Sequence, residues 1–186
     1  MTLVHTINDY PDVAGSPSLA PAAAVALSDV LAAGAALPAA LLTAVSNALS
    51  RLLQGTQANM AIGQTPIDVT AANARTRTSL LDPQDLAGSS FAAPQSGVEA
   101  FDNKPVSAIV DIDPSAGIQD LEGVGAVGLT VVQYTNNPSN ATSEAKAIGV
   151  QLTVYNDSSS SQDGSSSRSL IQPLLTPPNP TPLPLI

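Results

Sequence analysis

The densest group of potential metal ligands lies in residues 111–122, Asp-Ile-Asp-Pro-Ser-Ala-Gly-Ile-Gln-Asp-Leu-Glu. Asp111, Asp113, Ser115 and Glu122 have the spacing of positions 1, 3, 5 and 12 of an EF-hand loop, whose oxygen ligands suit calcium. This spacing of oxygen ligands would suit a calcium site.

Three features of the same segment depart from an EF-hand. The sixth position should be the glycine of the sharp turn, but Ala116 is sixth and Gly117 is seventh. Pro114 interrupts the loop, and Val106–Ile112 alternates like a strand where an EF-hand has a helix. The sequence favours an acidic turn between strands, with a weak calcium contact as the alternative, and we predict no metal ligands.

Residue counts exclude most catalytic chemistry. The chain has no cysteine, which removes thiolate nucleophiles, thiolate zinc sites and iron–sulfur ligation. Its single histidine is His5, next to a chain end, where order is usually poor. Asp82 and Asp85 have no evident partner acid or base, and the glycines of residues 123–128 lie in a strand pattern without a following helix or lysine. We predict no catalytic residue and no cofactor.

The charge balance bears on partners. Among 186 residues, 6 Lys+Arg face 15 Asp+Glu, a formal charge of −9, and charged residues make up 11% against about 25% in ordinary soluble domains. Six scattered basic side chains in an acidic chain do not supply the cluster that nucleic-acid binding requires. Solubility must then rest on hydroxyl groups and on sugars.

Two open glycosylation sequons occur, Asn140-Ala-Thr142 and Asn156-Asp-Ser158. Each lies in a predicted loop beside a strand, where a glycan would project into solvent. We predict glycosylation at Asn140 and Asn156, on condition that the chain is extracellular.

The apolar pattern of residues 20–53 predicts two helices. The second has an apolar stripe at helical spacing, with Pro38 at its start and Gly55 as its stop. That stripe comprises Leu41, Leu42, Val45, Leu49, Leu52 and Leu53. The first carries a shorter stripe between Val25 and Leu31 and ends near Gly34. Prolines, a glycine and a mainly alanine composition argue against a membrane span here.

The remainder alternates with a period of two, which is typical of half-buried antiparallel strands. Strands are predicted at Ile67–Thr70, Arg75–Thr78 (short and solvent-edged), Val106–Ile112, Val124–Tyr134, Ala147–Tyr155 and Ser169–Leu175, the last with Pro173 at an edge or bulge. Residues 156–168 form a Ser-rich hairpin tip, and Pro177–Ile186 is typical of polyproline II.

The order of these parts resembles the GAIN domain of polycystin-1-like proteins and adhesion-type receptors. The likeness covers residues 20–176 and rests on the helical pair, on Asn137-Pro138 after a strand, and on the strand–loop–strand order that follows. Self-cleaving members carry a His-Leu-Ser/Thr tripeptide beside cysteines and tryptophans, and this sequence has neither the tripeptide nor those residues. Self-proteolysis therefore carries over to no residue. The Ala/Pro/Ser-rich composition also resembles green-algal hydroxyproline-rich surface glycoproteins.

We accordingly predict an α+β fold, a small N-terminal helical pair packed on a mainly antiparallel β-sandwich with a Pro-rich C-terminal tail. Residues 1–19 are expected to be an extended segment, 20–55 a helical subdomain, 56–176 the β-sandwich and 177–186 a Pro-rich linker.

The expected function is that of a non-catalytic structural or interaction module, load-bearing or adhesive. We expect it at the cell surface, ciliary or flagellar included, within a larger membrane-linked protein. Its partners would be other protein subunits or ectodomain segments, with no nucleic acid, and it would meet a membrane only through a segment outside this chain. Edge strands such as Val124–Tyr134 would mediate assembly. The alternative is a calcium- or carbohydrate-binding β-sandwich.

Overall fold

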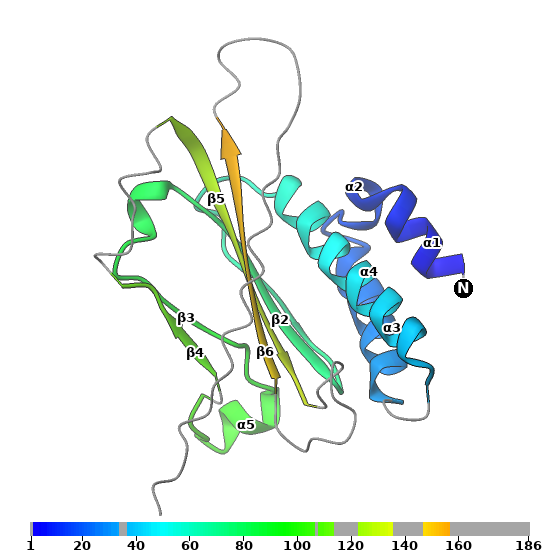
Figure 1. Cartoon of the computed structure of the whole chain (residues 1–186). Helices are drawn as coiled ribbons and strands as arrows, with labels where there is room; N and C mark the ends of the chain where they lie inside the picture. Colours follow the sequence, from blue (N-terminus) through cyan, green and yellow to red (C-terminus); the bar gives the residue numbers. More distant parts are fainter. Residues whose placement is uncertain (1, 34–36, 107, 114–122, 136–146, 157–186) are drawn as a thin grey trace, which may run out of the picture.

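The computed structural model describes residues 2–33, 37–106, 108–113, 123–135 and 147–156, and these form an α+β fold in three layers. Helices pack on one face of a four-stranded antiparallel sheet, and a two-stranded sheet lies on its other face (Figure 1). The α+β arrangement of N-terminal helices on antiparallel sheets confirms the predicted fold class.

The elements follow one another as helices first and strands second. The helices are α1 (Thr2–Asp9), α2 (Pro11–Ala14), α3 (Ala20–Ala32), α4 (Ala39–Ala58) and α5 (Gly97–Phe101), with a short 3-10 turn η2 (Pro83–Asp85). The strands are β1 (Ile67–Thr70), β2 (Ala74–Leu81), β3 (Ser90–Ala92), β4 (Ile109–Asp111), β5 (Val124–Tyr134) and β6 (Ala147–Asn156).

The expectation of an extended N-terminal segment over residues 1–19 is wrong, because α1 and α2 occupy most of it. Ile7 of α1 is fully buried and Val4 packs against the same core. Pro11 begins α2 at a position where a missing N–H costs nothing. Helices this short are marginal in isolation, so packing against α4 stabilises them.

The predicted helical pair is confirmed as α3 and α4, but the second helix does not stop at Gly55. It continues to Ala58, and Gly55 is buried within it. Gly15, which follows α2, packs directly against the backbone of Gly55 and Thr56. Gly55 thus serves a close approach between two chain segments rather than a helix end.

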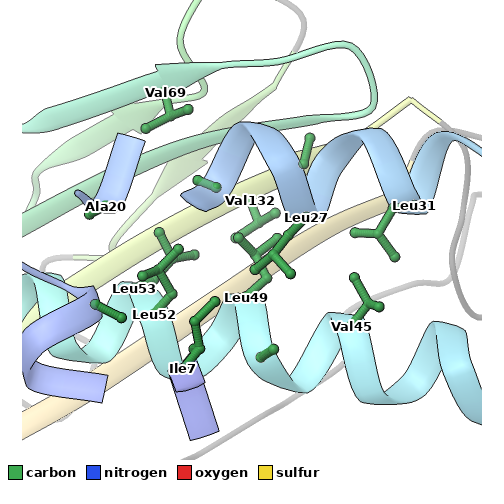
Figure 2. Close-up of a cluster of buried hydrophobic side chains, with 14 of the residues drawn as sticks. Ile7, Ala20, Leu27, Leu31, Val45, Leu49, Leu52, Leu53, Val69 and Val132 are labelled. Atoms are coloured by element: carbon green, nitrogen blue, oxygen red, sulfur yellow. The ribbon is translucent and has the colours of Figure 1, made fainter. Parts of the chain in front are cut away.

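The main core lies between the helices and the sheet. Figure 2 shows side chains of α3 and α4 interleaved, with Val69 and Val132 reaching them from the sheet. The labelled members from these two helices are Ala20, Leu27, Leu31, Val45, Leu49, Leu52 and Leu53. The predicted apolar stripe of the second helix therefore faces inward.

The four-stranded sheet has the order β1-β2-β5-β6, with every pair antiparallel. The strands expected at Ile67–Thr70, Val124–Tyr134 and Ala147–Tyr155 are present, the last one residue longer. Two expectations of position are wrong. The segment around Arg75–Thr78 is a central strand of eight residues, and Val124–Tyr134 is also central, flanked by β2 and β6, rather than an edge.

The strand expected at Val106–Ile112 is present but shorter, as β4 of the two-stranded sheet. That small sheet packs on the face of the large one opposite the helices, where Phe91 and Val110 meet Val131 and Ile148. The predicted strand at 169–175 and the linker at 177–186 lie outside the described residues.

The centre of the sheet face beneath α4 is polar. Gln57 of α4 is fully buried, and its Nε2 donates a hydrogen bond to Thr130 Oγ1 at 2.8 Å. The Tyr155 hydroxyl donates to Gln57 Oε1 at 3.4 Å. Gly128 makes room for this amide, because a Cβ there would overlap it.

A second buried polar contact joins α3 to the turn between β1 and β2. The fully buried Ser28 hydroxyl accepts hydrogen bonds from the backbone N–H groups of Asn73 and Ala74, at 3.0 and 2.9 Å. These bonds satisfy two backbone N–H groups of the turn, which would be costly to bury without an acceptor.

The contact at Gly15 leads to a stability prediction. Gly15→Ala places a methyl group against the α4 backbone, which cannot move cheaply, so we expect a loss of about 1–3 kcal/mol in the free energy of unfolding. Urea denaturation measures it. The matched control is Gly97→Ala, where a Cβ meets open space and a change within about 0.5 kcal/mol is expected. Equal effects of the two substitutions would contradict this packing.

Candidate interaction surface

The two predicted glycosylation residues have different outcomes. Asn140 lies outside the described residues. Asn156 is the last residue of β6, is exposed, and pairs with Val124. A glycan on Asn156 would therefore leave from the end of an edge strand, and its occupancy stays a prediction.

The acidic segment is described only at its start. Asp111 ends β4, and its Oδ1 accepts a hydrogen bond of 2.6 Å from the Ser90 hydroxyl on β3. An open hollow of about 540 Å³ is lined by Gly88, Ser89, Asp111, Ile112 and Asp113. Ser115 and Glu122 fall outside the described residues, and among those described no three acidic, histidine or cysteine side chains gather as metal ligands.

The remaining candidate residues lie apart. His5 is exposed on α1. Asp82 caps η2, its Oδ1 accepting from the Gln84 N–H at 2.9 Å, and Asp85 is exposed within that turn. The structure does not bring these three into one site.

The feature that sequence reasoning did not single out is α5. It presents Val98 and Phe101 to solvent, with 68% and 85% of their surface exposed. Large apolar side chains exposed together often mark binding surfaces, and aromatic residues are enriched where interfaces derive their energy. Phe101 is one of only two phenylalanines in the chain. Its exposure therefore leaves outside the core one of the few large aromatic side chains that could fill it.

Hydrogen bonds at both ends hold this short helix. A capping box closes its start: the Ser96 hydroxyl accepts from the Glu99 N–H at 3.2 Å, and a Glu99 carboxylate oxygen accepts from the Ser96 N–H at 2.9 Å. At its end the Lys104 N–H donates to the Glu99 carbonyl at 2.9 Å, while Asn103 takes a positive φ of 52°. Ser96-Gly-Val-Glu99 is a recognisable capping-box signature, so the sequence did contain a signal for α5.

The same Glu99 fastens α5 to the large sheet. Its carboxylate accepts two hydrogen bonds from the Arg75 guanidinium of β2, at 2.6 and 3.1 Å. Paired bonds of this kind add geometric specificity to charge attraction. The bond from the Ser96 N–H, followed by the Arg75 pairing, lowers the pKa of Glu99 from 4.5 to about 2. Phe101 and Val98 are thus carried on a helix whose position is determined by the sheet.

Comparison with protein-family models, curated proteins and solved structures finds no match for this chain. Within the described residues, no helix is both long enough and apolar enough to cross a bilayer.

The depressed pKa of Glu99 predicts a specific pH dependence. Because its folded pKa lies below the unfolded value, its stabilisation is fully present above about pH 4.5 and disappears as the pH falls toward 2. Glu99→Gln should therefore be less stable than the native chain at pH 6 in urea denaturation, and the difference should shrink steadily below about pH 4.5 until it is small at pH 2. Asp102→Asn, which alters an exposed pairing with Lys104, is the matched control. A difference independent of pH would contradict the role given to Glu99.

Calorimetric titration with calcium tests the hollow beside Asp111. Since the Asp111 carboxylate already accepts a bond from Ser90, we expect no heat of binding at micromolar calcium. Asp111→Ala serves as the comparison. Micromolar binding that this substitution abolishes would instead favour the calcium-binding alternative.

Proposed function

We propose that this protein is a non-catalytic structural and interaction module of a surface assembly, which engages another protein subunit through Val98 and Phe101 of α5. The observation that carries the proposal is the 85% exposure of Phe101 on an anchored helix. Because α5 is already anchored, a partner that covers this ring does not have to order the helix that carries it.

The charge distribution supports a protein partner. The chain carries −9 with only six basic residues, and Arg75 and Arg77 are already paired with Glu99 and Asp68. Polyanions such as nucleic acid find no basic cluster here. An apolar partner surface with a polar rim matches α5, whose apolar side chains stand beside Asp102 and Lys104.

The surface location and wider context belong to the same proposal. The polar uncharged composition and the sequons at Asn140 and Asn156 support a glycosylated extracellular module. The helices-then-strands order agrees with what the GAIN resemblance implies, so we place the chain within a larger polycystin-1-like surface or ciliary protein. We also propose that the two packed sheets are the layers of the expected β-sandwich.

Binding of the purified full chain to intact cells that produce the protein tests this function. Phe101→Ser should lower the affinity about tenfold or more, because a central aromatic anchor typically contributes at least 2 kcal/mol. Tyr10→Ser removes another exposed aromatic residue, 63% exposed, from the far end of the fold and is the matched control. Equal binding by the native chain and Phe101→Ser would refute the role of α5.

A further inference from the structure

β6 is the last strand of the four-stranded sheet, and within the described residues its backbone pairs on one side only, with β5. Its ten residues, Ala-Ile-Gly-Val-Gln-Leu-Thr-Val-Tyr-Asn, contain neither a charged side chain nor a proline. Natural edge strands usually carry charge, proline or a bulge, or are kept short, because an open edge templates pairing with another strand.

The opposite edge of the same sheet illustrates such protection. β1 has four residues, and Asp68 on it forms two hydrogen bonds with Arg77 of β2, at 2.8 and 2.6 Å. Both strands of the small sheet have three residues. β6 is therefore the long unprotected edge of the described fold.

The side chains of β6 are also incompletely covered. Ile148, Val150, Leu152 and Val154 are half-buried on the face toward the small sheet. Val127, Leu129 and Val131, their neighbours on β5, are at most 1% exposed. The apolar layer thus ends at β6 with surface that a further strand would cover.

We propose that this edge pairs with β6 of a second copy of the chain, antiparallel and about a two-fold axis perpendicular to the sheet. Directly opposed residues share a face in an antiparallel pair, so the axis passes beside one residue, Gln151 or Leu152. About Gln151, Val150 faces Leu152 of the second copy and Ile148 faces Val154. The two sheets become one continuous eight-stranded sheet.

The helices of the described part of the chain leave room for this pairing. α3 lies against β1 and β2, and α4 against β2 and β5, where Gln57 also reaches the Tyr155 hydroxyl of β6, so these helices lie mainly over the three strands behind the open edge. About Gln151, Asn156 would be opposite residue 146 and so beyond the start of β6. A glycan there is compatible with the dimer.

Length and charge favour a second copy over other strands. The other β6 offers nine matching residues without proline, whereas the chain's own 169–175 offers seven with Pro173 among them, and a proline removes one ladder hydrogen bond. Each copy carries −9, so two copies repel each other. Contact through an uncharged strand such as β6 adds no direct repulsion between opposed side chains. Because the remaining charges repel, salt should strengthen the association.

Analytical ultracentrifugation of the full chain tests the dimer. We expect a concentration-dependent dimer, tighter at about 0.5 M than at about 0.05 M salt. Val150→Lys and Gln151→Lys, on opposite faces of β6, should each raise the dissociation constant about tenfold or more. Gln151→Lys brings two like charges together at the axis, and Val150→Lys places a charge in the apolar layer, opposite Leu152 or Val154 of the second copy. Thr70→Lys, on the protected edge β1, should leave the dissociation constant unchanged. Circular dichroism confirms that each variant folds.

The cysteine-free sequence permits a second, independent measurement. A cysteine at the residue beside which the axis passes, Gln151 or Leu152, would lie within disulfide range of its own counterpart, since directly paired Cα atoms are about 4.5–5.5 Å apart. A cysteine at Ile148 would be too far from its counterpart, because each residue that separates the two positions along the strand adds roughly 3.3 Å. Covalent dimers at one of these two central positions, and none at Ile148, are the expected result.

Three results would overturn the proposal. These are a monomer at all concentrations, a dimer unaffected by Val150→Lys, and a monomer that dimerises only after Ile171→Asp, which would show that the chain's own 169–175 covers β6. None of them bears on binding through Phe101, so failure here leaves the proposed function of α5 standing.

Discussion

Burial of the central strand β5 on both faces is the constraint on which the other layers depend. Toward the helices it presents Gly128, Thr130 and Val132, and toward the small sheet Val127, Leu129 and Val131. The polar positions on the helix side would be costly to bury alone. Gln57 of α4 satisfies one of these polar positions by donating a hydrogen bond to the Thr130 hydroxyl. Because Gly128 has no side chain, the Gln57 amide can pack against the strand. The helical layer is therefore matched to one place on one strand.

The two proposed surfaces are connected to the two strands that flank β5. β2 on one side of β5 carries Arg75, which holds Glu99 and hence α5 with its exposed Phe101. β6 on the other side has no strand beyond it among the described residues. One surface presents side chains on an anchored helix and the other presents backbone hydrogen-bonding groups, so they suit different partners.

Much of the secondary structure was predictable because it depends on local periodicity. The stripe of α4, the alternation of β5 and β6 and the short β1 all appear where the pattern placed them. α1 was missed because its helical state depends on burial of Ile7 against α4. The role of Gly55 was misread because a glycine at a helix stop and one at a close contact look alike in sequence. The capping box Ser96–Glu99 was a local signal, and it lies in a stretch with little apolar periodicity.

The sequence by itself determined the α+β class, the helix-then-strand order, the acidic charge and the exclusion of thiol chemistry, since each follows from residue types or from spacing along the chain. Only the tertiary structure decided that β5 is central, that β6 is the open edge and that Phe101 is exposed while Ile7 is buried. Strand order and burial arise from contacts between residues distant in sequence, such as Gln57 with Thr130. The composition excluded most catalytic chemistry. Within the described residues, the distinctive groups of the fold are an exposed aromatic ring and an open strand edge.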